Sequence, residues 1–346
     1  MAKAEEFRNE ITSKIITALE NGTAPWQQPW NGAEAPQNGL TKHQYSGINT
    51  VILSIEAMKI DGGKDPRWYT YRQIEQISQM RQAEQAEHVA AQEAQGHQAD
   101  SSNTSNTSNT SDSSDGADRA DGSDRTVRTE RIHVRKGEKG TKVLLWKPTI
   151  GTDEHGNREI TSVLQRTFTV FHASQIEGLP AYNPPEINII EAHEKAEKII
   201  ADSGVRIFFG GGEAFYKPAE DYIQMPPRED FKSQEGYYST VLHELTHATA
   251  HPSRLNREQR CGKFSAEYAF EELIAELGSL FIASSARIPQ SDLEFQNHAS
   301  YIESWLKNLR NDNMYIFRAA AEASKAAGFL MKNAEQDSHE LEENGQ

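Results

Sequence analysis

Two of the three histidines in residues 242–251 have a spacing that suits a metal ion only if the segment is helical. His243 and His247 are four residues apart, so an α-helix would place both imidazoles on one face, within reach of one ion. Glu244 is suited to act as a general base that activates an attacking water. Nothing breaks a helix before Pro252. The fold must therefore bring a third ligand to this helix.

A second predicted helix, over residues 266–285, supplies that ligand. Ser265 is placed to cap it, and its apolar residues recur at helical spacing. Glu272 and Glu276 lie one turn apart on the opposite side, among small side chains that let another helix come close. We assign Glu272 as the third ligand of a zinc ion, which keeps a fourth position open. Glu276 would orient a histidine from outside the ligand set.

Other residues near these helices compete for a role. His251 follows His243 by eight positions and would share its helical face, so it is a rival third ligand or a supporting residue of the site. Glu267 and Glu271 lie nearer the apolar stripe of the second helix. We interpret both as solvated charges.

Cysteine and charge narrow the class of protein. The single cysteine, Cys261, excludes a disulfide framework and a cysteine zinc site, and it indicates a reducing cytoplasm. The net charge is −15, but residues 82–124 carry −8 and residues 333–346 carry −5, leaving about −2 elsewhere. The overall acidity therefore does not exclude a nucleic-acid partner. No apolar run approaches membrane-spanning length, so we expect no membrane partner and a cytoplasmic location.

Aromatic residues in the first half offer surfaces for base stacking. Trp26 and Trp30 lie in a proline-framed loop, and Trp68 follows Pro66. Exposed rings stack on bases without sequence preference, although such indoles fill cores equally well.

A basic segment adds to this surface. Residues 125–147 carry a net charge of +6. We expect a strand, a tight turn and a second strand over residues 142–146, paired as a hairpin. Glycines in the turn would let phosphates approach the basic residues Arg135, Lys136, Lys139 and Lys142. A solvated hairpin tip would be equally basic.

Composition predicts two domains of an α+β protein. From residue 82 the chain becomes polar, and from residue 101 it contains Ser-Asn-Thr repeats. Such a segment cannot bury enough apolar surface to offset the entropy lost on ordering. The first part of this segment is also compatible with a continued helix. Prolines after residue 179 mark a linker. We expect a first domain over 1–178 with a disordered acidic insertion at about 82–128, a linker over 179–186, a second domain over 187–332 and an acidic flexible tail over 333–346.

These motifs resemble those of a known family. The segment from His243 to Arg257 and the helix around Glu272 resemble the peptidase domain of ArdC-like antirestriction proteins. The arrangement of two histidines on one helix and a glutamate ligand on a second helix resembles that of the gluzincin metallopeptidases. Trp68-Tyr69-Thr70 and the basic turn resemble the N-terminal domain of ArdC-like and TraC-like primase proteins. The resemblance implies a single-stranded-DNA-binding domain followed by a gluzincin-like metallopeptidase domain.

The implied function is that of a single-stranded-DNA-binding zinc metallopeptidase that protects incoming plasmid DNA in conjugation, with an unknown protein substrate. One alternative is a non-catalytic protein that coats single-stranded DNA and has a structural zinc site. Another is an accessory module of a primase or relaxase. Glu244 favours the enzyme, because a purely structural site would not need it.

Overall fold

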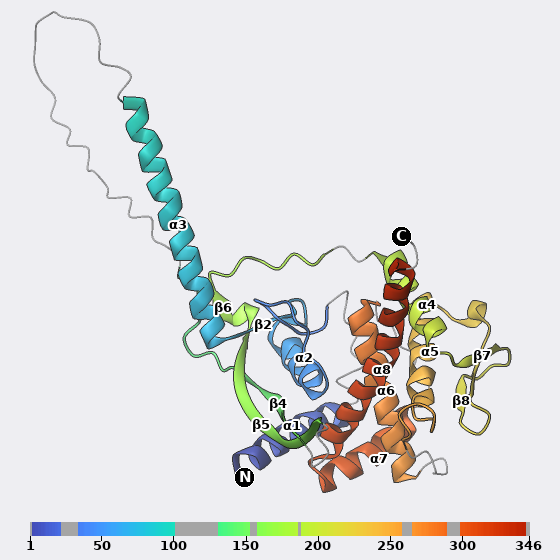
Figure 1. The fold of residues 1–346 in the computed structure, drawn as a ribbon. Coiled ribbons are helices and arrows are strands. Elements are labelled where there is room, and N and C mark those ends of the chain that lie inside the picture. The colour runs from blue at the N-terminus through green and yellow to red at the C-terminus, as the bar shows by residue number, and fades with distance from the viewer. Residues whose placement is uncertain are drawn as a thin grey trace, which may run out of the picture.

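The computed structural model describes residues 2–21, 34–100, 131–152, 158–185, 188–257, 265–288 and 298–343. An N-terminal region contains a four-stranded sheet, and a C-terminal region combines a small three-stranded sheet with long helices (Figure 1). The expected α+β architecture is therefore confirmed. Among the described residues, no helix is both long and apolar enough to cross a membrane.

The N-terminal region is organised around one mixed sheet. Its elements are α1 (Ala2–Glu20), β1 (Gln37–Asn38), α2 (Ile48–Asp61), β2 (Arg67–Thr70), α3 (Tyr71–Asp100), β3 (His133–Val134), β4 (Thr141–Thr152), β5 (Arg158–His172), the 3-10 turn η1 (Ala173–Gln175) and β6 (Ile176–Glu177). The strand order is β1-β2-β5-β4, with β1 and β2 parallel and the other neighbours antiparallel. β5 pairs back on β4 as a long antiparallel hairpin.

The prediction that the strands on either side of the basic turn pair with each other as a hairpin is wrong. β3 pairs with β6 in a separate two-stranded sheet, and β4 pairs with β5 instead. The turn between β3 and β4 packs on η1, where Gln175 donates from Nε2 to Glu138 Oε2 and to the Lys139 carbonyl, both at 3.0 Å. Ile132 and Ile176 are buried in one small core, so apolar contacts draw β3 toward β6.

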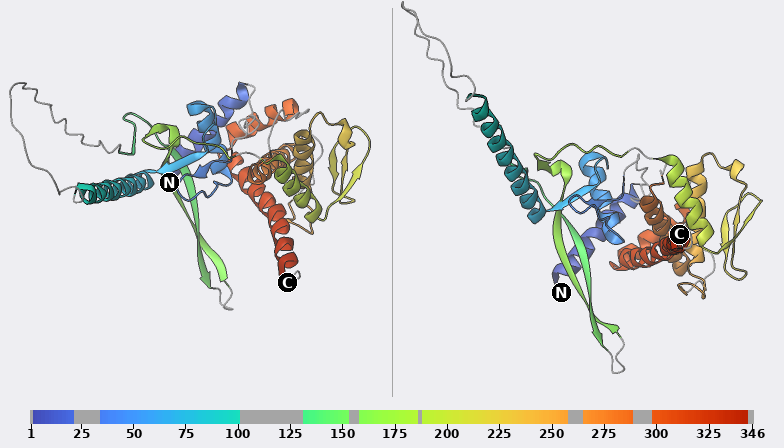
Figure 2. Two further views of the ribbon diagram at one scale, coloured as in Figure 1. Left: turned by 90° about the horizontal axis from the view of Figure 1, so that it is seen from above. Right: turned by 45° about the horizontal axis from the view of Figure 1, so that its top comes forward.

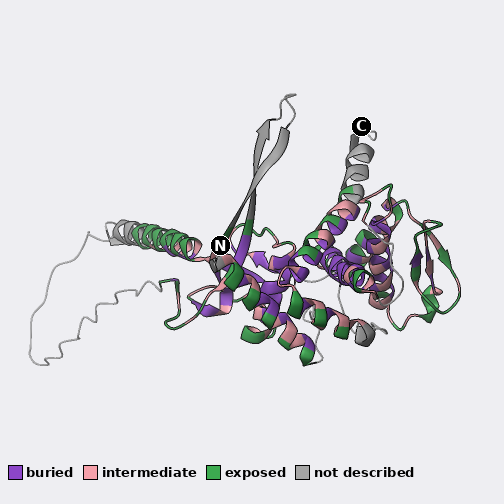
Figure 3. Cartoon of the chain, turned by 90° about the horizontal axis from the view of Figure 1, so that it is seen from below, coloured by how far each residue is buried: buried purple, intermediate pink, exposed green. Residues whose placement is uncertain are grey.

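Two elements project from the body of the molecule. α3 extends away from the rest of the chain in Figures 1 and 2, and the β4–β5 hairpin points in another direction. Most of the described α3 surface is exposed (Figure 3). α3 continues through residue 100, which is the continued helix that the sequence left open for the first part of the insertion. Its remainder, residues 101–128, lies outside the described residues.

In the C-terminal region, helices α5 and α6 pack against each other, and α4, α7 and α8 pack around them. Its elements are α4 (Ile189–Asp202), β7 (Arg206–Phe209), β8 (Phe215–Lys217), β9 (Tyr222–Met225), the 3-10 turn η2 (Arg228–Asp230), α5 (Gln234–Ala248), α6 (Ala266–Ala286), α7 (His298–Asn311) and α8 (Tyr315–Glu343). The small sheet has the order β7-β9-β8. α8 continues through residue 343, where a flexible tail from residue 333 was expected.

One apolar core runs through both regions. α1 contributes Phe7, whose ring meets that of Phe317 of α8 edge-on, with centroids 6.4 Å apart. Thr12 of α1 donates to the Asn313 carbonyl at 3.2 Å. The first helix therefore packs on the C-terminal helices, although it precedes the N-terminal sheet in sequence.

Candidate functional site

The two helices with the candidate ligands begin at capped serines. The Ser233 side chain accepts from the Gly236 amide at 3.1 Å at the start of α5, and Ser265 accepts from the Tyr268 amide at 3.0 Å at the start of α6. Each cap satisfies an amide that has no partner within its helix. The caps fix the residue at which each helix begins, and the candidate ligands follow within regular helix.

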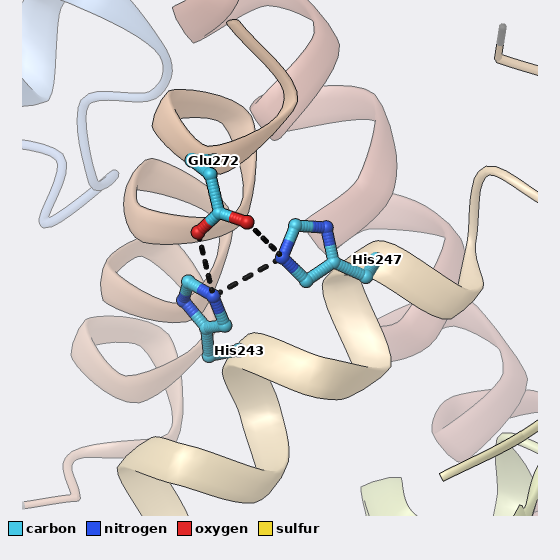
Figure 4. A group of neighbouring side chains, drawn as sticks. All are labelled: His243, His247 and Glu272. Atoms are coloured by element: carbon cyan, nitrogen blue, oxygen red, sulfur yellow. Dashed lines mark hydrogen bonds and ion pairs between the residues drawn. The ribbon is translucent and has the colours of Figure 1, made fainter. Parts of the chain in front are cut away.

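His243, His247 and Glu272 converge between α5 and α6 (Figure 4). The Nε2 atoms of the two histidines are 3.1 Å apart. Glu272 Oε2 lies 3.6 Å from His243 Nε2, and Glu272 Oε1 lies 3.5 Å from His247 Nε2. In a tetrahedral site with metal–ligand bonds of about 2.0–2.1 Å, ligand atoms are about 3.3 Å apart. The three side chains therefore have the spacing and donor chemistry that a divalent ion requires.

The electrostatics of this cluster also favour a cation. Burial alone would lower the pKa of His247, but the charge of Glu272, a hydrogen bond to Glu271 and the charge of Glu244 raise it to about 9. Burial alone would raise the pKa of Glu272, but His247 and His243 lower it to about 2. The site therefore stabilises positive charge, whether a proton or a metal ion supplies it.

Each histidine turns its other ring nitrogen toward a second carboxylate. His243 Nδ1 lies 3.7 Å from Glu276 Oε1, which is the supporting position expected for Glu276. His247 Nδ1 lies 3.3 Å from Glu271 Oε1. Both imidazoles therefore direct Nε2 toward the centre of the cluster, and a carboxylate in this outer position orients a metal-binding histidine.

The interpretation of Glu271 as a solvated charge is wrong. Only 9% of the residue is exposed, and Arg257 binds its carboxylate with two nitrogens, at 2.7 and 3.2 Å. α6 is buried on nearly all sides, so the edge of its apolar stripe lies inside the protein. The sequence reasoning missed both residues. A glutamate at the edge of an apolar stripe requires a partner if the helix is buried, and that was the available signal.

His251 lies outside the cluster, so its assignment as a ligand or supporting residue is contradicted. α5 ends at Ala248, before the eight-residue spacing from His243 is completed. The His251 Nδ1 atom instead lies 2.7 Å from Ser253 Oγ and 4.0 Å from Asp221 Oδ2. Glu244, by contrast, is on the same helix as the candidate ligands His243 and His247 and is 8% exposed.

The expected aromatic stacking surface is not supported at Trp68. This side chain is fully buried and packs with Leu53, Val143 and Val170, so a base cannot reach it. Trp26 and Trp30 lie outside the described residues. A tryptophan on a short strand beneath a helix fills a core, which was the alternative reading of these indoles.

The basic residues between β3 and β4 are accessible. Lys136, Lys139 and Lys142 are exposed and make no ion pair within the described part of the chain. Arg135 is also exposed but pairs with Glu138 at 2.9 Å. Gly137 adopts a φ of 92°, which favours glycine and makes the turn tight. Three free ammonium groups thus lie along one turn and the start of β4.

Comparisons with known proteins match both regions. Residues 5–118 match the family model described as the N-terminal domain of anti-restriction factor ArdC, and residues 194–322 match one described as a zincin-like metallopeptidase. A metal-free crystal structure of the antirestriction protein ArdC from plasmid R388 superposes with a TM-score of 0.66 at 31% identity, covering 95% of this chain and 98% of that chain. The Mn(II)-bound structure of that protein gives a TM-score of 0.64 at 32% identity, covering 94% and 97%.

Relatives in sequence include two forms of the DNA primase TraC of Escherichia coli, 33% and 32% identical over 94% and 96% of this chain. The chain spans only 27% and 20% of their lengths. The uncharacterized protein y4eC of Sinorhizobium fredii is 31% identical over 94% of this chain and 91% of its own length. Taken with the structural match over almost the whole of ArdC, these likenesses show that the chain belongs to the ArdC-like antirestriction family, with an ArdC N-terminal domain followed by a zincin-like domain.

Proposed function

We propose that this chain is a metal-dependent peptidase that binds single-stranded DNA and acts in antirestriction. The convergence of His243, His247 and Glu272 beside Glu244 carries the proposal. The zincin-like family match supports a peptidase, and the likeness to ArdC supports the antirestriction role. The proposed domains are residues 1–178 for DNA and 187–332 for the metal site, joined by the segment 179–186.

The ion is proposed to be Zn²⁺, held by the two histidines and Glu272. Two imidazoles and one carboxylate form a common catalytic zinc donor set, although the same set also suits other divalent ions. The R388 ArdC structure with Mn(II) supports a divalent ion of this kind in the family. The metal content of the purified chain, measured by elemental analysis, tests which ion it takes.

The residues of the site have separate roles in this proposal. A bound divalent ion supplies Lewis acidity, which polarises a peptide carbonyl and acidifies water. Glu244 accepts the proton of the attacking water and later donates it to the leaving amine. Glu276 holds the His243 imidazole in the orientation that directs Nε2 to the cluster. Burial of Glu244 keeps bulk water from competing for its proton.

DNA contact is proposed at the basic turn. Lys136, Lys139 and Lys142 are exposed and form no ion pair with any acidic residue that the structure describes. Lysines in such positions bind phosphates without reading the base sequence. The likeness to the DNA primase TraC supports DNA as a partner of the chain.

Glu244→Gln tests the enzyme against a protein that only coats DNA. The amide is nearly isosteric and Glu244 is not a proposed ligand, so the variant should keep its metal and its DNA affinity. Hydrolysis of labelled casein, assayed with and without single-stranded DNA, should fall by about 10²–10⁴-fold. Glu235→Gln, at the start of the same helix, is the control and should retain activity.

Protection of transferred DNA in a restricting host then decides the biological role. If proteolysis causes protection, Glu244→Gln should lose it. Full protection by Glu244→Gln, together with loss in the Lys136→Glu/Lys139→Glu variant, would favour a DNA-coating protein with a structural metal.

A further inference from the structure

A buried arginine lies beside the cluster of candidate metal ligands and is linked to His247 through Glu271. Arg257 has 7% of its side chain exposed. Its Nη2 donates to Glu271 Oε1 at 2.7 Å, and its Nε donates to Glu271 Oε2 at 3.2 Å. Glu271 Oε1 also lies 3.3 Å from His247 Nδ1. A continuous series of contacts therefore joins Arg257, Glu271 and His247.

We infer that Glu271 and Arg257 are positioning residues for the metal ligand His247. Glu271 accepts a hydrogen bond from the Nδ1–H group of His247 and so selects the tautomer whose Nε2 lone pair faces the ion. Arg257 holds the Glu271 carboxylate in place and ionised. The inference rests on the proposed metal site, and it assigns a function to two residues outside the ligand set.

The geometry explains why the holding residue is an arginine. Besides Glu271, Arg257 donates to Thr249 Oγ1 at 2.7 Å and to the Thr246 carbonyl at 3.0 Å. Thr246 belongs to the last turn of α5, and its carbonyl also accepts from the Thr249 hydroxyl at 2.6 Å. The planar guanidinium of Arg257 donates to the Glu271 carboxylate and to the end of α5 at the same time. A lysine ammonium has three donors on a single nitrogen and cannot reproduce this geometry. Arg257 thus fixes Glu271 of α6 relative to the helix that carries His247.

A purely structural ion pair is the competing explanation, and the same segment provides its control. Arg254 has 11% of its side chain exposed, pairs with Asp221 and donates to the Ala248 carbonyl of α5 at 2.6 Å. Arg254 makes no contact with His243, His247 or Glu272 among those described. Loss of either arginine should therefore cost stability, but only loss of Arg257 should alter the metal.

The experiment measures metal binding by the full chain after metal removal. Zn²⁺ affinity is obtained by chelator competition, and ligand geometry is read from the visible absorption of the Co²⁺ form. Glu271→Gln should weaken Zn²⁺ binding by about 10- to 100-fold and change the Co²⁺ spectrum. Arg257→Lys should show part of that loss with the same spectral change. Arg254→Lys should lower the thermal midpoint of unfolding but keep the wild-type Zn²⁺ affinity and Co²⁺ spectrum. Glu267→Gln, at an exposed position of α6, should also keep the wild-type Zn²⁺ affinity and Co²⁺ spectrum.

The outcomes separate this inference from the metal site itself. Wild-type affinity and spectrum in both Glu271→Gln and Arg257→Lys would overturn the positioning role, and so would an equal loss of affinity in Arg254→Lys. If His247→Ala also binds Zn²⁺ normally, the metal site is wrong and the inference fails with it. Should Glu271→Gln not fold because Arg257 is left unpaired, the double variant Glu271→Gln/Arg257→Met removes both charges and is read by the same criteria.

Discussion

Gly278 of α6 lies directly against Thr246 of α5, so that a Cβ atom added to Gly278 would stand 2.4 Å from Thr246 Cγ2. Thr246 is fully buried and lies between His243 and His247 in the sequence of α5. The absence of a side chain at Gly278 therefore sets how closely the two ligand-bearing helices approach. This contact is part of the reason that Glu272 reaches both imidazoles.

Gly278→Ala should push α5 and α6 apart. We expect a loss of about 1–3 kcal/mol in the free energy of unfolding, the usual cost of overpacking a core, and weaker metal binding. Chemical unfolding and a Zn²⁺ titration measure the two effects. Gly328→Ala on α8 is the matched control, because a Cβ there meets no atom within 4 Å. It should be neutral or stabilise by up to about 1 kcal/mol, as alanine is the better helix former.

Replacement of each candidate ligand should separate binding residues from neighbours. Glu272→Ala should lose the metal, because two imidazoles alone leave the ion without its carboxylate. Glu276→Ala should lose it only in part, since Glu276 lies beside His243 rather than at the centre of the cluster. His251→Ala should retain a full equivalent by elemental analysis. An empty site in His251→Ala and a full one in Glu272→Ala would contradict the assignment.

Lys136→Glu/Lys139→Glu should weaken binding to all single-stranded sequences alike. If each lysine neutralises one phosphate, the slope of log affinity against log salt should fall by about 1.4, or about 0.7 per contact. Fluorescence anisotropy over a series of salt concentrations measures it in the full chain, because α1 packs on the C-terminal helices and a truncated N-terminal piece would expose that face. Lys325→Glu/Lys332→Glu on α8 makes the same charge change and should leave the slope unchanged.

The pair formed by Asp221 and Arg254 should make stability depend on pH. Burial alone would raise the pKa of Asp221, but hydrogen bonds from Arg254 and Tyr216 lower it below its ordinary value. A carboxyl with a lowered pKa in the folded state contributes stability above its unfolded pKa, about 3.9, and loses it as the pH falls through the lower folded value. The stability difference between wild type and Asp221→Asn, from urea unfolding, should therefore be full near neutral pH and shrink below about pH 4.

Asparagine is a suitable replacement because position 221 has a φ of 51°, a conformation that asparagine adopts readily. Glu220→Gln, in the same turn but in an exposed pair with Lys217, should show little pH-dependent difference. A pH-independent difference for Asp221→Asn would mean that the carboxylate is not held ionised by Arg254.

The sequence by itself pointed to His243, His247 and Glu272, which meet at the cluster, but it left His251 open as a rival third ligand. A four-residue spacing on a helix leaves one geometry for His243 and His247, and the placement of Glu272 on a second helix follows from the same periodicity. The α+β class and most helix positions followed from these periodic patterns as well. Local rules suffice where neighbours in sequence are also neighbours in space.

Tertiary structure decided what local patterns leave open. Glu271 is a buried carboxylate paired with Arg257, rather than a solvated charge, because α6 is buried on nearly all sides and Arg257 comes from another segment. Trp68 is a core residue because α2 and the sheet cover it, and β3 pairs with β6 because buried isoleucines draw those strands together. Helical periodicity fixes the face on which a side chain lies, but burial depends on which distant segment covers that face, and this is settled by packing of the whole chain.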